Sequence, residues 1–258
     1  MCHLINWAHN LYLKKMSEWF SEWFDSTYYH ILYKDRDDNE AHFFISNLMT
    51  YLGTSKGSKI LDLACGKGRH SKYLESLGYS VVGLDLSKNS IDSAKSLSSN
   101  YLSFDVHDMR DKLPYAPYDV ILNLFTSFGY FNNQDDDLQT LSNVSNALDV
   151  NGVFVFDFLN IEYLEKNLVK KETKIVDGIA FDLNRFIENG SLYKNITFEI
   201  EGNNYTFQER VDALKYQKFV DYFSKVGLEI TAVFGDYQLT AFDNQRSKRL
   251  IILSKKKV

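Results

Sequence analysis

The chain has 258 residues, of which 45% are hydrophobic and 24% charged, so it can bury a complete core without disulfides or metal ions. Its 29 Lys and Arg residues against 34 Asp and Glu residues give a formal charge of −5, which argues against a dedicated nucleic-acid-binding protein. No apolar run is long enough to cross a bilayer, and the two cysteines, Cys2 and Cys65, favour a reduced, cytoplasmic protein without a membrane segment.

Short apolar runs alternate with amphipathic helical patterns through the first part of the chain. Apolar side chains recur every three or four residues from Glu40 to Leu52, which predicts a helix. The predicted strands run from Lys59 to Ala64, Val81 to Asp85, Tyr101 to Asp105, Tyr118 to Leu124 and Val153 to Phe158. Between several of them lie helical patterns, one ending at Gly78, one beginning after Ser87 and one ending at Asn151-Gly152. This alternation indicates an α/β fold with a parallel sheet that helices cover on both faces.

The pattern changes after the fifth predicted strand. From Lys174 to Glu209, alternating runs are separated by turn signals typical of hairpins, namely Asp177-Gly178, Asn189-Gly190 and Gly202-Asn203-Asn204. These runs predict a small antiparallel β insertion. We therefore expect an N-terminal segment of residues 1–39, a core of residues 40–170 and 211–258, and an insertion of residues 171–210.

The last part of the chain predicts one helix and two strands. The helix bears Leu214 and Phe219 and ends at Gly227. The strands run from Leu228 to Phe234 and from Leu250 to Ser254. Because the loop between these strands is too irregular for a crossover helix, they should pair antiparallel.

A glycine turn, Cys65-Gly66-Lys67-Gly68, joins the first predicted strand to a helix. Such a turn lets the backbone approach a ligand and directs helix N–H groups at it, which suits nucleotides and other anionic cofactors. Ser71 stands at the third glycine position, so the dinucleotide fingerprint is incomplete. Asp85 lies 17 residues beyond Gly68, where a carboxylate can accept hydrogen bonds from both ribose hydroxyls.

The run Leu61 to His70 (LDLACGKGRH), followed by Gly83 to Ser87 (GLDLS), resembles the class I S-adenosylmethionine-dependent methyltransferases. The resemblance covers roughly residues 40 to 160 and the terminal strands. It implies a doubly wound, Rossmann-like sheet of seven strands with an antiparallel last strand, which separates this family from nicotinamide-dependent dehydrogenases. It also implies S-adenosylmethionine as the cofactor.

The same resemblance assigns the cofactor contacts. Ala64, Gly66 and Gly68 would hold the methionine part, Asp85 the ribose, Leu86 and Asp108-Met109 the adenine, and Asn123 would lie beside the transferable methyl group. Ala64 replaces the first glycine of the family motif, a departure that still leaves room for backbone contact.

The aromatic segment from Trp19 to Arg36 resembles the N-terminal lid of small-molecule methyltransferases, including aminosugar N-methyltransferases. Tyr33 and Arg36 would then contact the methionine end of the cofactor, and the guanidinium of Arg36 would donate two hydrogen bonds to its carboxylate. The alternative is an aromatic cap on the core with a surface arginine.

Methyl transfer from a sulfonium is an in-line displacement, so the enzyme mainly aligns the nucleophile and excludes water. No diagnostic triad is present, and we assign no catalytic residue. Tyr130, Asp157 and Arg210 are the predicted acceptor contacts, although Tyr130 could instead pack and Asp157 could cap a helix. The insertion would cover the acceptor pocket, or alternatively serve dimerisation.

The predicted function is therefore methyl transfer from S-adenosylmethionine to a nitrogen or oxygen atom of a small molecule, by a cytoplasmic monomer or homodimer. No metal site is expected, because the histidines and cysteines lack ligand spacing. Asn123-Leu124-Phe125 departs from the Asn/Asp-Pro-Pro-Tyr/Phe motif, which disfavours adenine N6 or glutamine amide methylation. Two alternatives stay open: a non-catalytic protein that binds S-adenosylmethionine or S-adenosylhomocysteine, and an RNA methyltransferase.

Overall fold

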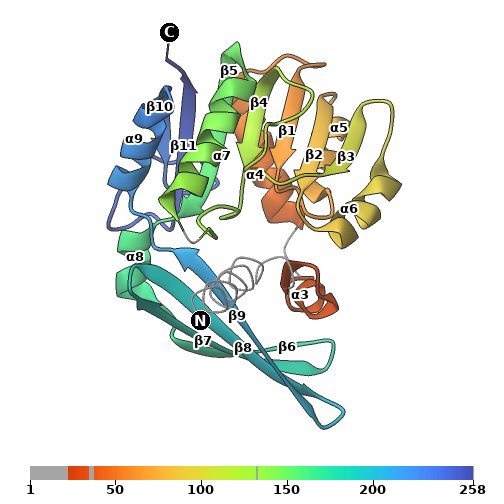
Figure 1. The fold of residues 1–258 in the computed structure, drawn as a ribbon, viewed down its shortest axis with the longest axis vertical. Helices are drawn as coiled ribbons and strands as arrows, with labels where there is room; N and C mark the ends of the chain where they lie inside the picture. Colours follow the sequence, from red (N-terminus) through yellow and green to blue (C-terminus); the bar gives the residue numbers. More distant parts are fainter. Residues whose placement is uncertain (1–22, 35–37, 132, 258) are drawn as a thin grey trace, which may run out of the picture. The chain divides into compact units, whose positions relative to one another are not determined.

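The structure is a computed structural model that describes residues 23–34, 38–131 and 133–257. The chain forms two compact units, whose elements are labelled in Figure 1. The larger unit comprises Arg36–Gly129, Asn133–Asn167 and Leu214–Val258, and the smaller comprises Met1–Asp35, Tyr130–Asn132 and Leu168–Ala213. Within the described ranges, no helix is both long enough and apolar enough to cross a membrane.

A seven-stranded sheet forms the centre of the larger unit. Its strands are β1 (Lys59–Leu63), β2 (Ser80–Asp85), β3 (Leu102–Val106), β4 (Tyr118–Asn123), β5 (Leu148–Leu159), β10 (Leu228–Phe234) and β11 (Arg249–Lys256). They lie in the order β10-β11-β5-β4-β1-β2-β3. Strands β1 to β5 pair parallel, whereas β11 pairs antiparallel with both β5 and β10. The predicted doubly wound sheet with an antiparallel last strand is thus confirmed.

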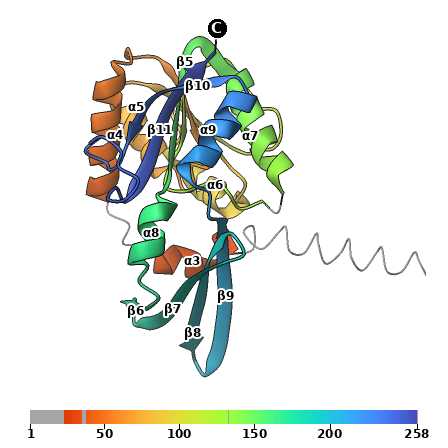
Figure 2. The same cartoon turned by 90° about the vertical axis from the view of Figure 1, so that its left-hand side faces the viewer.

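Helices cover both faces of this sheet. They are α4 (Asp38–Leu52), α5 (Arg69–Ser76), α6 (Lys88–Ala94), α7 (Gln134–Ala147) and α9 (Tyr216–Lys225). Figure 2 shows α4 and α5 on one side of the sheet and α7 and α9 on the other. Phe44 of α4 and Leu74 of α5 are fully buried in one core cluster, while Phe219 of α9 packs on Phe156 of β5. Because both faces are covered, the loops at the carboxyl ends of the strands are where a ligand site can form.

Two boundaries near β5 differ from the prediction. The helix predicted to end at Asn151-Gly152 ends at Ala147, and Leu148 already has an extended backbone. A Cβ atom on Gly152 would lie 2.8 Å from the carbonyl oxygen of Tyr118, so this glycine serves close strand packing and does not end the helix. Helix α8 (Ile161–Asn167), which follows β5, has only 7 residues. That length is too short for apolar periodicity to reveal it.

The smaller unit contains a four-stranded antiparallel sheet in the order β6-β7-β8-β9. The strands are β6 (Lys171–Val176), β7 (Ile179–Glu188), β8 (Ser191–Ile200) and β9 (Asn203–Asp212). Three two-residue turns connect them, Asp177-Gly178, Asn189-Gly190 and Glu201-Gly202, and all six residues have positive φ. The third turn therefore begins one residue before the predicted Gly202-Asn203-Asn204, because a type I′ turn favours glycine at its second position.

Helix α3 (Thr27–Leu32) belongs to the same unit and shares an apolar core with this sheet. The Trp23 side chain is buried, and its ring centroid lies 4.5 Å from that of Phe207. Phe181 and Phe198 are buried in this core as well. These three phenylalanines of the insertion pack in one core with Trp23 and Leu32.

Candidate functional site

The glycine turn between β1 and α5 has a left-handed backbone at three positions. Ala64, Gly66 and Gly68 have φ angles of 65°, 56° and 78°. A Cβ atom on Gly66 would meet nothing within 4 Å, whereas a Cβ atom on Gly68 would lie 2.5 Å from Cζ of Phe104. Gly66 therefore leaves open space beside the turn, and Gly68 allows the start of α5 to pack tightly on the sheet.

Asp85 ends β2 and holds the glycine turn in place. One carboxylate oxygen accepts a hydrogen bond from the N–H of Gly66 at 2.7 Å, and the other accepts one from the N–H of Ser87 at 2.8 Å. The side chain remains half-buried. This contact to the turn could not be predicted, because a backbone N–H donor leaves no trace in a side-chain pattern.

The residues assigned to adenine follow β2 and β3. Leu86 exposes 39% of its surface, which is unusual for a leucine and leaves an apolar face available. The carboxylate of Asp108 is bound by the guanidinium of Arg110, with 2.5 Å between Oδ2 and Nη2. Burial raises the pKa of Asp108, but the hydrogen bonds and charge of Arg110 outweigh burial and lower the pKa below its usual range. The carbonyl oxygen of Met109 accepts a hydrogen bond from Nδ2 of Asn143.

Asn123, the last residue of β4, carries a buried oxygen atom that can accept a hydrogen bond. Its side chain is 1% exposed, and Nδ2 donates to the carbonyl oxygens of Leu63 and Ser127 at 3.1 and 3.3 Å. Its Oδ1 atom has no hydrogen-bond partner in the described part of the chain. An unsatisfied buried oxygen is costly, and a donor group on a bound ligand would relieve it. Together with the open space at Gly66, this atom fits the predicted cofactor site.

Asp62 lies beneath the glycine turn and is completely buried. Its Oδ2 atom accepts a hydrogen bond from the hydroxyl of Ser71 at 2.6 Å. Burial raises the pKa of Asp62 to about 6, the charge of Asp85 adds to the increase, and the hydrogen bond from Ser71 opposes it. A carboxyl group with a raised pKa stabilises the fold when protonated, and this contribution is lost as the pH rises through about 6.

We expect the stability of the chain to fall relative to Asp62→Asn as the pH rises. Between pH 5 and 7 the parent should lose about 1 kcal/mol more than the variant, because only the parent ionises at this position. Denaturant unfolding at both pH values measures the difference. A parallel pH dependence of the two proteins would contradict the prediction.

The turn after β4 is strained and is held by a buried ion pair. Phe125 and Thr126 have φ angles of 58° and 64°, a conformation that costs non-glycine residues about 1–3 kcal/mol each. Asp157, fully buried within β5, accepts a hydrogen bond from the N–H of Phe125 at 2.8 Å and pairs with Arg249 at 2.7 Å. Asp157 was predicted to contact the acceptor or to cap a helix. Its position inside β5 excludes the cap, and its carboxylate is engaged by Arg249.

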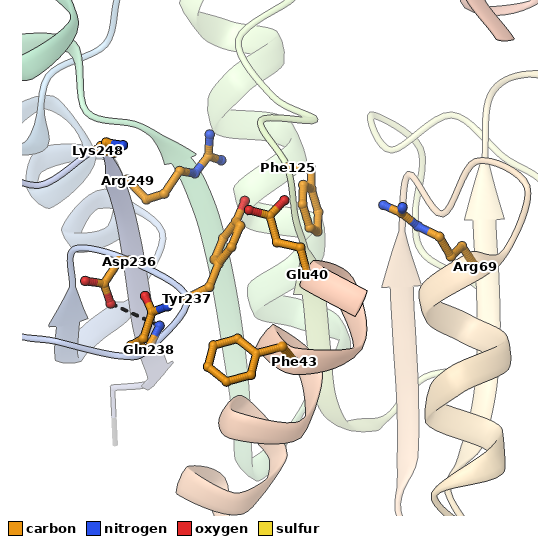
Figure 3. Close-up of a pocket in the computed structure, with 9 residues that line it drawn as sticks. All are labelled: Glu40, Phe43, Arg69, Phe125, Asp236, Tyr237, Gln238, Lys248 and Arg249. Atoms are coloured by element: carbon orange, nitrogen blue, oxygen red, sulfur yellow. Dashed lines mark hydrogen bonds between the residues drawn. The ribbon is translucent and has the colours of Figure 1, made fainter. Parts of the chain in front are cut away.

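A cavity of about 440 Å³ lies in the larger unit, beside this turn. Figure 3 shows the residues that line it, which are Glu40, Phe43, Arg69, Phe125, Asp236, Tyr237, Gln238, Lys248 and Arg249. In this view the carboxylate of Glu40 lies between the side chains of Phe125 and Tyr237. Across the described residues, the carboxylate of Glu40 has no hydrogen bond or ion pair. Sequence reasoning missed this pocket because helix α4 and the loop between β10 and β11 carry no motif.

The remaining predicted site residues fall in the smaller unit or outside the described ranges. The hydroxyl of Tyr33 donates to Glu209 at 2.7 Å, and the ring of Tyr130 lies 5.4 Å from that of Phe24. The guanidinium of Arg210 pairs with Asp212 and donates to the carbonyl oxygen of Phe131. Arg36 lies outside the described residues, as do residues 19–22 and 35 of the segment from Trp19 to Arg36. In the described ranges, no group of three or more His, Cys, Asp or Glu residues could hold a metal ion.

Comparison with known proteins agrees with this geometry. Residues 54–210 match the family model described as a methyltransferase domain. The chain is 25% identical over 218 residues to the "Putative methyltransferase YqeM" of Bacillus subtilis, with 75% of this chain and 86% of that protein covered. An S-adenosylmethionine-dependent methyltransferase from Clostridium acetobutylicum has a similar structure, with a TM-score of 0.75 and 20% identity over 90% of this chain and 96% of that one. The sugar N-methyltransferase KedS8 from Streptoalloteichus sp. gives a TM-score of 0.71 and 15% identity, covering 89% and 93% of the two chains.

Proposed function

Because the chain belongs to the S-adenosylmethionine-dependent methyltransferases, we propose that it transfers a methyl group to a nitrogen or oxygen atom of a small molecule. The similarity of its fold to that of a sugar N-methyltransferase supports a small acceptor. So does the cavity beside the turn after β4, whose volume of about 440 Å³ suits a small molecule.

The residues around the glycine turn would hold the cofactor. We propose Ala64, Gly66 and Gly68 for its methionine part, Asp85 for the ribose, Leu86, Asp108 and Met109 for the adenine, and Asn123 for a donor group near the reactive end. The Oδ1 atom of Asn123, which has no hydrogen-bond partner among the described residues, and the open space at Gly66 support this assignment. S-adenosylmethionine, when bound, supplies an electrophilic methyl group on a sulfonium sulfur.

The single observation that carries the choice of acceptor is the carboxylate of Glu40 in the cavity. In Figure 3 it lies between the side chains of Phe125 and Tyr237, and it makes no direct ion pair in the described part of the chain, although the charge of Arg249 acts on it across the cavity. Aromatic faces and a carboxylate together attract an amine. An amine must lose a proton to become a nucleophile, and a carboxylate within hydrogen-bond reach can accept it. Glu40 therefore favours an amine nitrogen as the methyl acceptor.

The test is transfer of a tritium-labelled methyl group from S-adenosylmethionine to a panel of amino sugars, amino acids and small amines. We expect Glu40→Gln to lower kcat/KM for an amine acceptor roughly ten- to a hundredfold, because a charge-assisted hydrogen bond is lost. Its dissociation constant for S-adenosylhomocysteine should stay within about twofold of the parent value.

Glu229→Gln is the matched control, since Glu229 is an exposed residue of β10 that does not line the cavity. The proposal fails if Glu40→Gln transfers to amines at the parent rate. Labelling of RNA with no labelling of small molecules would favour an RNA methyltransferase instead.

Other sequence-based assignments stay predictions. They are the lid role of residues 1–39, the cofactor contacts of Tyr33 and Arg36, the acceptor contacts of Tyr130, Asp157 and Arg210, the role of the insertion at residues 171–210, the cytoplasmic location, and the monomeric or dimeric state. We propose that the N-terminal segment closes over the cofactor, because its aromatic run from Trp19 to Arg36 resembles the N-terminal lid of small-molecule methyltransferases.

A further inference from the structure

The strained turn after β4, at Phe125 and Thr126, forms hydrogen bonds with residues of β5 and β11, two strands that lie far from it in the sequence. Oδ2 of Asp157 accepts the N–H of Phe125 at 2.8 Å, and the carbonyl oxygen of Asp157 accepts the N–H of Thr126 at 3.0 Å. Arg249, at the start of β11, donates from Nη2 to the hydroxyl oxygen of Thr126 at 3.0 Å. The backbone N–H groups of both strained residues and the hydroxyl of Thr126 are therefore hydrogen-bonded to Asp157 or Arg249.

The ion pair between Asp157 and Arg249 holds both side chains in the positions from which they bind the turn. Oδ1 of Asp157 accepts a hydrogen bond from Nε of Arg249 at 2.8 Å, and Nη2 of Arg249 lies 2.7 Å from the same oxygen as an ion-pair contact. The carboxylate is fully buried and the arginine side chain is 16% exposed. Strands β5 and β11 pair antiparallel through this region, with Ile251 opposite Asp157. A paired carboxylate this deeply buried is a rigid anchor, because release of either partner would leave an uncompensated charge.

The anchored turn sets the position of the Phe125 ring. That ring stacks on His70 of α5, with 4.8 Å between the centroids and 10° between the planes. It also lies 5.4 Å from the ring of Tyr237, and Phe125 lines the cavity with Glu40. If the turn relaxed to an ordinary backbone conformation, the ring would leave His70 and the cavity would lose one of its walls.

We propose that Asp157 and Arg249 are positioning residues that hold Phe125 in the wall of the acceptor cavity, stacked on His70 of helix α5. The assignment of the cavity rests on the proposed function, whereas the positioning of Phe125 does not. The ion pair contacts the acceptor side through Phe125 and through Tyr237, whose hydroxyl donates to Oδ2 of Asp157 at 3.4 Å, and Arg249 itself lines the cavity. Neither residue of the pair has a hydrogen bond to the glycine turn in the described structure. The ion pair therefore sets acceptor alignment and leaves cofactor affinity nearly unchanged.

The test reads the His70 ring protons of the full chain by nuclear magnetic resonance, with His70→Gln to identify them. Stacking on Phe125 shifts these protons upfield, and Phe125→Leu gives their position without the ring. We expect Arg249→Met and Asp157→Asn to move the His70 signals at least half of the way to the Phe125→Leu position. Arg246→Met is the matched control, since Arg246 forms an exposed ion pair with Asp243 in the neighbouring loop.

Calorimetry with S-adenosylhomocysteine separates positioning from general support of the fold. The folded variants should bind it within about threefold of the parent. Parent-like His70 signals in a folded Arg249→Met or Asp157→Asn variant would overturn the proposal, as would a loss of S-adenosylhomocysteine binding together with the His70 shift. If neither variant folds, Thr126→Val removes the hydrogen bond from Arg249 to the turn, and parent-like His70 signals in that protein would overturn the proposal. All these signals are read without an acceptor, so they stand apart from the outcome of the transfer assay.

Discussion

Asp85→Ala is expected to weaken binding of S-adenosylmethionine roughly ten- to a hundredfold. The carboxylate at the end of β2 is assigned to the ribose, and losing charge-assisted hydrogen bonds costs about 1.5 to 3 kcal/mol. The structure adds a second cause. Asp85 also accepts the N–H groups of Gly66 and Ser87, so its removal loosens the turn that approaches the cofactor. Titration calorimetry of the folded variant measures the dissociation constant.

Asp105→Ala is the matched control for this substitution. Asp105 lies on the neighbouring strand β3, in register with Leu84, and its carboxylate accepts a hydrogen bond from the hydroxyl of Tyr115 at 2.9 Å. It has no hydrogen bond or ion pair to the glycine turn in the described structure. We expect its affinity for S-adenosylmethionine to match the parent within about twofold. An unchanged dissociation constant for a folded Asp85→Ala protein would remove Asp85 from the cofactor site.

Most of the sheet could be predicted from the sequence because its central strands are nearly continuous buried runs between helical patterns. Strands buried on both faces need such runs, and Val81 to Leu84 is one of them. The antiparallel last strand was predictable because the loop between the final two strands cannot form a crossover helix. The glycine turn was predictable as well, since its backbone needs residues that tolerate positive φ.

The contacts around the proposed acceptor cavity could not be predicted, because they join residues far apart in the chain. Asp157 and Arg249 are 92 positions apart, and neither stands in a motif. Their pairing follows from the antiparallel register of β5 and β11, which local patterns do not determine. The strain at Phe125 and Thr126 is also invisible in the sequence, since these residue types do not favour a left-handed backbone.

Two glycines of the same turn are expected to fail in different ways when alanine replaces them. Gly68→Ala should lower the free energy of unfolding by about 2 to 5 kcal/mol, which combines left-handed strain with overpacking. The overpacking arises because the new methyl group would lie 2.5 Å from the buried ring of Phe104. Gly66→Ala meets no atom within 4 Å, so strain alone should cost it about 1–2 kcal/mol.

For cofactor binding the order should reverse: Gly66→Ala should lose more affinity than Gly68→Ala, although it loses less stability. The methyl group of Gly66→Ala would occupy the space assigned to the cofactor, so its affinity for S-adenosylhomocysteine should fall, whereas Gly68→Ala points its methyl group into the core. Adding Phe104→Leu to Gly68→Ala should recover part of the lost stability, because it removes the ring atoms in the overlap. Denaturant unfolding measures the stability, and calorimetry the affinity for S-adenosylhomocysteine, of the parent, the two single variants and the double variant. Equal losses of stability in Gly66→Ala and Gly68→Ala would show that the contact between Gly68 and Phe104 does not limit the packing of this turn.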